Sequence, residues 1–574
     1  MEKAPDLPRL PLLGIAFAQG ICLYLLYRSV ELKVWPSDSP LWSYPLWTLA
    51  VAVPLLLLLS VDRRNWVAAA KLVAAFGAVL ALLAVYTGWQ ATPHGAFPTS
   101  DLTFVFVVTI GLALFKGLMY LQQRADERPL SYQVLFTNSW RNFLVGALAA
   151  LFTLIFWLIL MLWGQLFRVI EVNFFHDLFT EDWFVIPVLT VAFAIGIVLF
   201  RGLTRVIDSI TKLLHWLIKL LLPLVLLVAI VFLAALPFTG LDLLWATGSG
   251  TGLLLWLLAL VLFFTNAVYQ DGRETAPYPP ALHRALYVGL CVMPLIAGLA
   301  FYGLVLRVQQ YGWTVERCWA FVAWTVLALF AVGYVVGIVR RRDAWTGDLA
   351  RVNTAMGLVV LTVMLLANSP VLDFRKISLT SQLERLESGE VEPAAFDFWY
   401  VQRYLARPGY LAMEAMKSEL GDDDAELLSL IENPLPRRGA MPLVDPDALR
   451  ERMVFRPEPF AIPPELEPLL MGTALRIHAT GRSVPLVPVA IRVDMDEDGA
   501  DEYLLLVLDG GNIRFSQFFY RTDAGWQSRH LNHNHHLRRD DLLELLSNED
   551  IVLTSNRYKN VSIGDLELRP LNFD

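Results

Sequence analysis

Residues 142–166 read NFLVGALAALFTLIFWLILMLWGQL and contain no charged side chain. About 20 consecutive apolar residues in a helix are enough to cross the ~30 Å hydrocarbon core of a bilayer. A helix also satisfies its own backbone hydrogen bonds, which lipid cannot do. This stretch therefore predicts a membrane-spanning helix.

Ten more runs of similar length and hydropathy lie on both sides of this stretch. They are residues 10–29, 41–61, 66–88, 102–121, 184–200, 213–237, 251–269, 285–306, 318–339 and 352–371. The 574 residues are 56% hydrophobic and 17% charged, with a mean hydropathy of +0.51. Because soluble domains carry roughly a quarter charged residues, this composition excludes a cytosolic enzyme, a disordered protein and a nucleic-acid binder. We predict a polytopic α-helical membrane bundle of about 11 transmembrane helices in contact with the lipid bilayer.

The charged residues divide the chain in two. Residues 374–574 hold 22 Lys and Arg against 34 Asp and Glu, whereas residues 1–373 hold 24 and 20. We therefore expect the bundle at 1–373, a membrane-proximal helical segment and Pro-rich linker at 374–440, and a soluble α+β C-terminal domain at 441–574. Within the last 201 residues, helical patterns lie at 379–386, 399–405, 410–420 and 540–546, and strand-like patterns at 486–493, 503–508, 513–521, 551–554 and 561–568.

The positions of Lys and Arg predict the orientation in the membrane. They gather at alternate ends of the spans, as at Arg63–Arg64 and Arg340–Arg342. The opposite ends hold only Arg28, Lys33, Arg168, Arg307 and Arg317. Basic loops stay in the cytoplasm, so the N-terminus is expected there. An odd number of spans then places residues 374–574 outside, which is the periplasm if the protein lies in a bacterial inner membrane.

Several loops carry a recognisable set of motifs. Residues 266–272 read NAVYQDG, residues 307–317 read RVQQYGWTVER, residues 377–385 read ISLTSQLER, and FDF follows at 396–398. In order and spacing this set resembles the bacterial multi-pass membrane family known as domain of unknown function 4153, over roughly residues 130–420. The resemblance implies an inner-membrane protein and supplies neither an activity nor catalytic residues.

The acidic loop DMDEDGADE at 494–502 is the clearest candidate for a metal site. Oxygen ligands at positions 1, 3, 5 and 9 and a glycine at position 6 suit a hard cation such as Ca²⁺. The candidate ligands are Asp494, Asp496, Asp498, the carbonyl of Ala500 and Glu502. Strand-like runs on both sides predict a strand–loop–strand setting, and we expect Ca²⁺ in a structural role. The alternative is an ordinary acidic hairpin tip. The histidines at 530, 533, 535 and 536 favour a polar loop over a second metal site.

A basic stripe is the best candidate for a site in the membrane half. The spacing of the residues in it predicts one face of a single helix. The residues are Arg201, Arg205, Asp208, Lys212, His215 and Lys219. One interpretation is a helix on the cytoplasmic leaflet facing anionic headgroups, with Pro223 marking the bend into a short span. The other is a cavity lining that holds an anion or a lipid.

Other polar residues within the predicted spans have simpler interpretations. Lys71 and Lys116 lie near cytoplasmic ends, where a lysine can extend its amine to the interface. Asn266, Asn353 and Asn368 are expected to form interhelical hydrogen bonds.

The sequence contains no enzyme motif: neither a phosphate-binding glycine loop, nor a His-Glu-x-x-His zinc motif, nor a nucleophile elbow. The first functional hypothesis is therefore a non-enzymatic membrane protein whose periplasmic domain binds a cell-envelope protein partner. The second is a transporter or lipid-handling permease that uses the bundle. The third is a membrane-embedded enzyme acting on a lipid-linked substrate.

Overall fold

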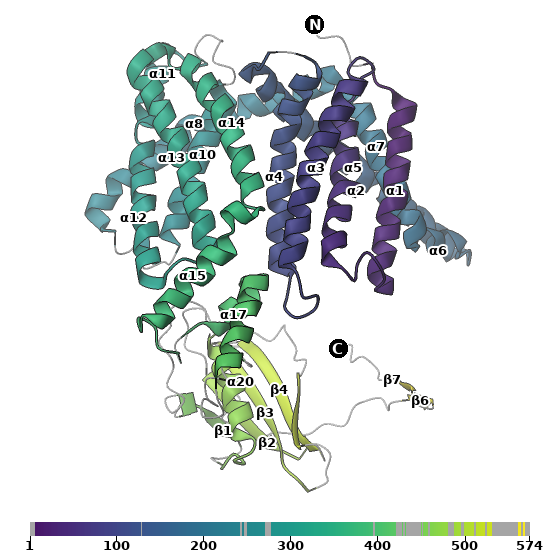
Figure 1. Ribbon diagram of the computed structural model, residues 1–574, viewed down its shortest axis with the longest axis vertical. Coiled ribbons are helices and arrows are strands. Elements are labelled where there is room, and N and C mark those ends of the chain that lie inside the picture. The colour runs from purple at the N-terminus through teal and green to yellow at the C-terminus, as the bar shows by residue number, and fades with distance from the viewer. Residues whose placement is uncertain are drawn as a thin grey trace. The chain divides into compact units, whose positions relative to one another are not determined.

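A computed structural model shows a helical bundle and a small β-sheet unit (Figure 1). The structure describes residues 6–127, 129–241, 244–245, 249–269, 277–393, 396–420, 428, 431, 449–450, 452–456, 460–479, 487–494, 499–509, 512–522, 525–530, 561–563 and 566–568. Two compact units are present. The first comprises Met1–Phe396 with Val401–Leu428, and the second comprises Asp397–Tyr400 with Ser429–Asp574.

Eleven helical segments in the described residues are long and apolar enough to cross a membrane, which confirms the predicted number. They are α1 (Arg9–Leu32), α2 (Pro40–Ser60), α3 (Trp66–Gln90), α4 (Ser100–Ala125), α5 (Tyr132–Val169), α7 (Asp182–Gly202), α8 (Thr204–Thr239), α10 (Gly250–Tyr269), α11 and α12 together (Pro280–Leu290 and Met293–Tyr311), α13 (Val315–Arg341, continued by η1, Arg342–Ala344) and α14 (Thr346–Leu366). Each overlaps one predicted run. The short helix α6 (Phe174–Thr180) joins α5 to α7.

The bundle has two hydrophobic cores. One joins α1–α5, α7 and the start of α8, around buried residues such as Leu56, Val145 and Ile197. The other joins α8 and α10–α14, around Leu258 and Tyr334. Figure 1 shows α1–α4 and α10–α14 as neighbouring groups of helices. We call the helices of the first core (α1–α5, α7 and the start of α8) the N-terminal half-bundle and those of the second core (the rest of α8 and α10–α14) the C-terminal half-bundle.

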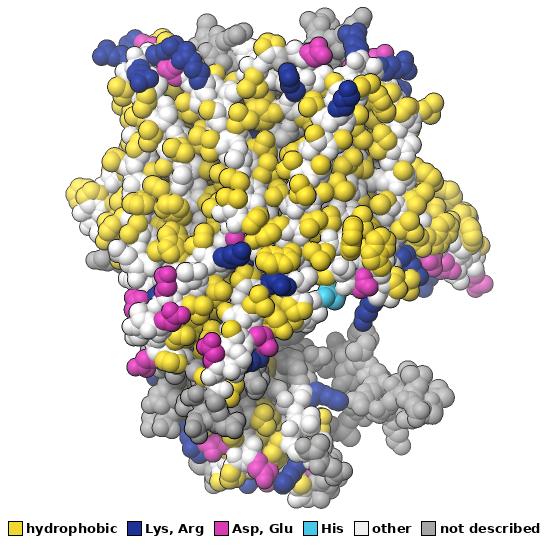
Figure 2. Space-filling view, viewed as in Figure 1, with side chains coloured by type: hydrophobic (Ala, Val, Ile, Leu, Met, Phe, Trp, Pro, Cys, Tyr) yellow, Lys and Arg dark blue, Asp and Glu magenta, His cyan; other side chains and the backbone are white. Residues whose placement is uncertain are grey.

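Small residues let helices within a half-bundle approach closely, as is usual where lipid supplies no hydrophobic driving force. A Cβ added at Gly196 of α7 would lie 2.9 Å from the Cα atom of Ala149 on α5, and one added at Gly20 of α1 would lie 2.7 Å from that of Pro187 on α7. The outward surface is apolar instead. Figure 2 shows hydrophobic side chains over the middle of the bundle and charged side chains towards its ends. This distribution matches a lipid-facing band with polar margins.

Three helices follow the last span: α15 (Phe374–Glu387) after the turn η2 (Pro370–Leu372), then α16 (Phe398–Tyr404) and α17 (Ala406–Glu419). They confirm the three predicted helical patterns between residues 379 and 420. Asp373 begins α15 by accepting hydrogen bonds from the backbone N–H groups of Arg375 and Lys376, which is normal N-cap geometry. Both α15 and α17 belong to the first compact unit.

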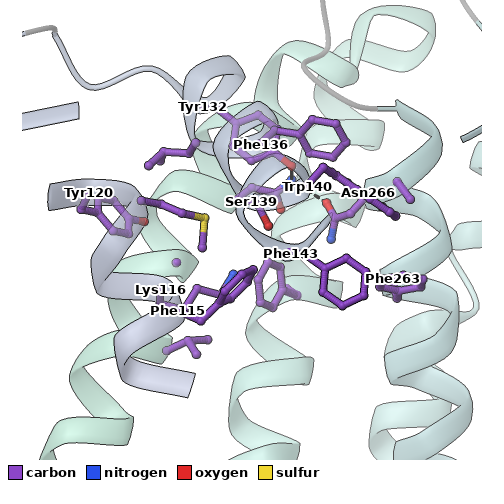
Figure 3. Close-up of a pocket in the computed structure, with 17 residues that line it drawn as sticks. Phe115, Lys116, Tyr120, Tyr132, Phe136, Ser139, Trp140, Phe143, Phe263 and Asn266 are labelled. Atoms are coloured by element: carbon purple, nitrogen blue, oxygen red, sulfur yellow. Dashed lines mark hydrogen bonds between the residues drawn. The ribbon is translucent and has the colours of Figure 1, made fainter. Parts of the chain in front are cut away.

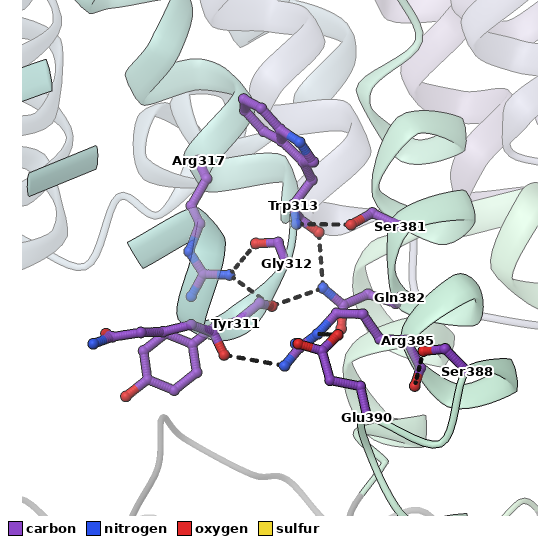
Figure 4. A network of polar contacts seen from close by, with 10 residues as sticks. Tyr311, Gly312, Trp313, Arg317, Ser381, Gln382, Arg385, Ser388 and Glu390 are labelled. Atoms are coloured by element: carbon purple, nitrogen blue, oxygen red, sulfur yellow. Dashed lines mark hydrogen bonds and ion pairs between the residues drawn. The ribbon is translucent and has the colours of Figure 1, made fainter. Parts of the chain in front are cut away.

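Two of the motif segments that carry the family resemblance contact each other (Figure 4). The loop between α12 and α13 lies against α15. Gln382 donates hydrogen bonds to the carbonyl oxygens of Tyr311 and Trp313, at 3.0 and 2.9 Å, and Arg317 donates to the Gly312 carbonyl at 2.8 Å. Gly312 has a φ of +69°, a backbone conformation that favours glycine. The two Gln382 hydrogen bonds attach α15 to the end of the C-terminal half-bundle at which α12 and α13 are joined.

The second unit contains a five-stranded sheet in the order β1-β2-β3-β4-β5. The strands are β1 (Val454–Arg456), β2 (Val487–Val493), β3 (Glu502–Asp509), β4 (Asn512–Thr522) and β5 (Gly525–His530). β1 pairs in parallel with β2, and the other neighbours are antiparallel. The helix α20 (Glu467–Ala479) contributes Leu470 and Ala474 to a core with Leu505 and Phe519.

The α+β composition and the three predicted strands at 486–521 are thus confirmed. The strands β1 and β5 and the helix α20 were not predicted. Where one strand was predicted at 561–568, the structure has two short antiparallel strands, β6 (Val561–Ile563) and β7 (Leu566–Leu568). The helix predicted at 540–546 and the strand at 551–554 lie outside the described residues.

Candidate functional site in the helical bundle

A cavity of about 450 Å³ lies between α4, α5, α10, α13 and α14 (Figure 3). Eight aromatic side chains dominate its wall. They are Phe115, Tyr120, Tyr132, Phe136, Trp140, Phe143, Phe263 and Phe330. Since α4 and α5 belong to the N-terminal half-bundle and the other three helices to the C-terminal one, the cavity forms where the two half-bundles meet.

Four polar side chains form a hydrogen-bonded network beside the cavity. The Nδ2 atom of Asn353 on α14 donates to the Tyr132 hydroxyl at 2.8 Å and to the Oδ1 atom of Asn266 at 2.6 Å. The Tyr334 hydroxyl lies 2.5 Å from the Oδ1 atoms of both asparagines. The network joins α5, α10, α13 and α14, so it fixes the C-terminal wall of the cavity against α5. It confirms the expected interhelical role of Asn266 and Asn353.

Tyr120 completes the wall from α4. Its hydroxyl donates to the carbonyl oxygen of Thr354 on α14 at 3.0 Å. This contact is possible because residue 357 is glycine: a Cβ there would lie 2.3 Å from the Tyr120 hydroxyl. The close approach of α4 and α14 therefore depends on Gly357.

Lys116 is the one basic side chain among the residues lining the cavity. Figure 3 shows it on the α4 side, across from Phe263 and Asn266. No carboxylate of the described residues forms an ion pair with it, and none is among the lining residues. An unneutralised ammonium group within a membrane is energetically costly and usually marks a binding site or pathway. The sequence interpretation of Lys116 as a residue extending to the interface did not identify this cavity.

Arg201, predicted to belong to the basic stripe, has a structural role instead. It lies at the end of α7, which Leu203 separates from α8, so the prediction of one common helical face is wrong for this residue. Its side chain is 8% exposed and donates to the carbonyl oxygens of Leu58 and, at 2.9 Å, of Val61. The guanidinium group thus binds the carbonyl end of α2, where a cation interacts favourably with the helix dipole.

The rest of the stripe lies on α8, which continues unbroken through Pro223 to Thr239. The basic residues of the stripe from Arg205 onwards and the span that follows Pro223 therefore belong to one continuous helix. Arg205, Asp208 and Lys212 are exposed. His215 packs against Phe136 and Trp140, with ring centroids 5.4 and 4.7 Å away. Because those two aromatic residues also line the cavity, α8 supports the cavity from outside.

Lys219 is held at the far end of the stripe. Its amine lies 5.5 Å from the centre of the Tyr278 ring, and the Tyr278 hydroxyl donates to the Lys219 carbonyl oxygen at 2.6 Å. The described geometry thus separates the six predicted residues into one structural arginine, three exposed charges and two side chains packed on aromatic rings.

The acidic loop of the second unit connects β2 to β3, as predicted for a strand–loop–strand setting. Gly499 has a φ of +85°, and its N–H donates to the Oδ2 atom of Asp494 at 3.1 Å. Glu502 begins β3 and is 7% exposed. Asp496 and Asp498 lie outside the described residues, as do His533, His535 and His536. The Ca²⁺ site therefore remains a prediction.

Comparison with known proteins gives one finding. Residues 46–416 match the family model described as "Domain of unknown function (DUF4153)". This match includes all the helices that line the cavity and begins well before the motifs of the sequence resemblance. No curated protein and no solved structure matches the chain significantly.

Proposed function

Because the chain belongs to the DUF4153 family, whose description assigns no function, we propose its role from the geometry of the cavity. The membrane bundle binds an amphipathic anion, such as a lipid or lipid-linked molecule with one anionic group, and handles it as a permease would. The observation that carries this proposal is Lys116, a basic residue without an acidic partner among the described residues, in the wall of an aromatic cavity.

The lining matches both parts of such a ligand. Aromatic faces and edges provide apolar contact for a hydrocarbon chain, and the Lys116 ammonium group provides a counter-charge for the anionic group. The Asn266 amide and the Ser139 hydroxyl add hydrogen-bonding groups on the lining. A volume of about 450 Å³ lies within the range of about 300–1,000 Å³ that is typical of small-molecule pockets. That space accommodates a small headgroup and part of one chain, but not a whole phospholipid.

The basic residues of α8 support the same role as candidate contacts for an anion or lipid. Arg205 and Lys212 are exposed, and each basic side chain near a membrane surface attracts anionic lipid by about 1 kcal/mol. On the same helix, His215 packs on two aromatic residues of the cavity wall, and Lys219 packs on Tyr278, which is outside the lining. Arg201 is omitted from this set, because its donors bind the carbonyl oxygens of α2.

We place the N-terminus in the cytoplasm and residues 374–574 in the periplasm of a bacterial inner membrane. Two features support this orientation: the concentration of Lys and Arg at alternate ends of the spans, and the odd number of spans, eleven in the described residues. The cavity then lies towards the cytoplasmic side, near the end of α4 that carries Arg124.

A second candidate function is binding of a cell-envelope protein by the second unit. The observation that favours it is β5, which among the described strands pairs with β4 alone. A terminal strand can accept an added strand from a partner. This role is compatible with lipid handling by the bundle, and the oligomeric state is open in both cases.

We also propose that the 494–502 loop binds Ca²⁺ in a structural role. The turn at Gly499, which returns its N–H to Asp494, brings the two ends of the acidic loop together. The nine-residue loop contains six acidic side chains, and their carboxylates repel one another unless a cation neutralises them.

Mass spectrometry of lipids that co-purify with the full-length protein in a mild detergent tests the permease proposal. We expect the wild type to retain one class of anionic amphiphile, Lys116→Gln to lose it, and Lys116→Arg to keep part of it. Lys71→Gln is the matched control, because Lys71 is an exposed lysine within α3. Equal retention by Lys116→Gln and Lys71→Gln would refute the proposal.

A further inference from the structure

A second group of basic and aromatic side chains lies at the other end of α4, outside the cavity. Trp89, near the end of α3, has two cations on its ring: the Lys376 amine at 5.8 Å and the Arg407 guanidinium carbon at 4.9 Å from the ring centre. Lys376 belongs to α15 and Arg407 to α17. We call these three residues the Trp89 cluster.

The surrounding contacts hold the cluster in place. Arg407 donates through Nη1 to the Thr92 hydroxyl at 2.6 Å and to the Thr92 carbonyl oxygen at 3.2 Å. Its Nε–H has no acceptor among the described residues. Lys376 lies in the first turn of α15, which the contacts in Figure 4 attach to the bundle. Two helices that follow the last span thus bring their cations to one tryptophan of α3.

The acidic residues nearby already have partners. Asp373 is 6% exposed and accepts hydrogen bonds from Tyr86 at 2.7 Å and Gln90 at 2.6 Å, besides capping α15. Asp101 pairs with Arg403 at 3.5 Å. No carboxylate in the described part of the chain forms an ion pair with Lys376 or Arg407. The two positive charges therefore remain available to an external anion.

The location of the cluster indicates the kind of anion. Trp89 ends α3 at the margin opposite Arg63 and Arg64, which precede the same helix. Tryptophan is enriched at the headgroup level of a membrane, whereas Lys and Arg are depleted on the outer side. Most Lys and Arg residues of the bundle lie at the opposite ends of the spans. Two cations without an acidic partner on an interfacial tryptophan are therefore exceptional at this margin. Phosphate groups are the anions that a membrane presents at this depth.

We propose that the Trp89 cluster binds a phosphate group at the outer membrane interface. Arginine offers a planar set of donors suited to phosphate oxygens, and lysine adds a mobile point charge. Sixteen residues of α4 separate its start at Ser100, beside the cluster, from Lys116. That distance is about 24 Å along a helix. The site is therefore distinct from the cavity and does not depend on the proposed permease role, and its location on the outer side rests on the proposed orientation.

Binding of short-chain phosphatidylglycerol to the full-length protein in detergent tests this site, with short-chain phosphatidylcholine and inorganic phosphate as the other two probes. All variants carry Lys116→Gln, so that the cavity lysine does not contribute. We expect Lys376→Gln with Arg407→Gln to weaken binding of phosphatidylglycerol at least tenfold. Lys33→Gln with Arg168→Gln is the control, because it removes two exposed basic residues from the ends of α1 and α5 at the same margin.

The three probes distinguish the sources of the phosphate. Tighter binding of phosphatidylglycerol than of phosphatidylcholine or inorganic phosphate supports a lipid headgroup site, if the Lys376/Arg407 variant loses this preference and the Lys33/Arg168 control keeps it. Binding of inorganic phosphate with similar affinity and the same loss supports a site for soluble phosphate compounds. Unchanged phosphatidylglycerol and phosphate binding in a cluster variant that elutes and melts like the control overturns the proposal.

Discussion

Asn353 on α14 donates one hydrogen bond to Asn266 on α10, at 2.6 Å, and another to the Tyr132 hydroxyl on α5, at 2.8 Å. One amide group therefore connects three helices beside the cavity. Within a bilayer such bonds contribute about 0.6 kcal/mol on average and up to about 1.7 kcal/mol each.

We expect Asn353→Ala to lower the free energy of unfolding by about 1–2 kcal/mol, measured by denaturation in mixed micelles. Asn266→Ala removes part of the same network, so the double variant should lose less than the sum of the single variants. Strict additivity would contradict the shared network.

Gly357→Ala should displace Tyr120, because the added Cβ would lie 2.3 Å from its hydroxyl. Overpacking of this kind costs about 1–3 kcal/mol and should also reduce retention of the cavity ligand. Gly298→Ala on α12 is the control, since a Cβ there meets no atom within 4 Å.

The clash at Gly357 also predicts a specific rescue. Tyr120→Phe removes the hydroxyl oxygen, and the next ring atom lies 3.4 Å from the added Cβ. We therefore expect Gly357→Ala with Tyr120→Phe to be more stable than Gly357→Ala alone. A double variant that is less stable would show that the approach of α4 to α14 is limited by another contact.

Arg201→Met should destabilise the N-terminal half-bundle by about 2–4 kcal/mol, because charge-assisted hydrogen bonds to the Leu58 and Val61 carbonyl oxygens are lost. Arg205→Met, an exposed position at the start of α8, should leave the unfolding free energy nearly unchanged. Comparison of the two by thermal unfolding in detergent separates the structural arginine from the candidate lipid contact. Equal effects would contradict this assignment.

Calcium binding can be tested on the full-length protein by titration calorimetry and thermal unfolding. At a hundredfold excess over its dissociation constant, a ligand stabilises the native state by about 2.7 kcal/mol. We expect Asp496→Asn to abolish both the heat of binding and the shift in melting temperature. Asp501→Asn, in the same loop but outside the ligand pattern, should retain them. No heat of binding in the wild type would favour the acidic hairpin interpretation.

The spans and several strands could be predicted because their signals are local. The run at 142–166 is long and apolar enough to cross the membrane as a helix. The runs in β2 and β3 are continuously apolar over five or more residues, and β4 is rich in aromatic residues. β1 has only three residues and is a strand because it pairs with β2. Three residues are too few to show a strand pattern in the sequence. β5 contains Gly525, Gln527, Ser528 and Arg529 and becomes a strand by pairing with β4.

The stripe shows where periodicity alone fails. The spacing from Arg201 to Lys219 is helical, but the chain breaks at Leu203 and places Arg201 on a different helix. A break of one residue leaves the polar pattern almost unchanged, so the sequence did not reveal it. The buried contacts of Arg201 with α2 depend on how α7 packs, which is not a local property.

Local chemistry determined the membrane class, the eleven spans and the α+β character of the second unit, because bilayer thickness and strand alternation act on consecutive residues. Tertiary structure alone decided the cavity and the Trp89 cluster. Lys116, Asn266 and Asn353 are separated by up to 237 positions, and Trp89 and Arg407 by 318. Such side chains become neighbours only when helix faces pack, and the packing depends on small residues such as Gly357 whose partners lie on other helices.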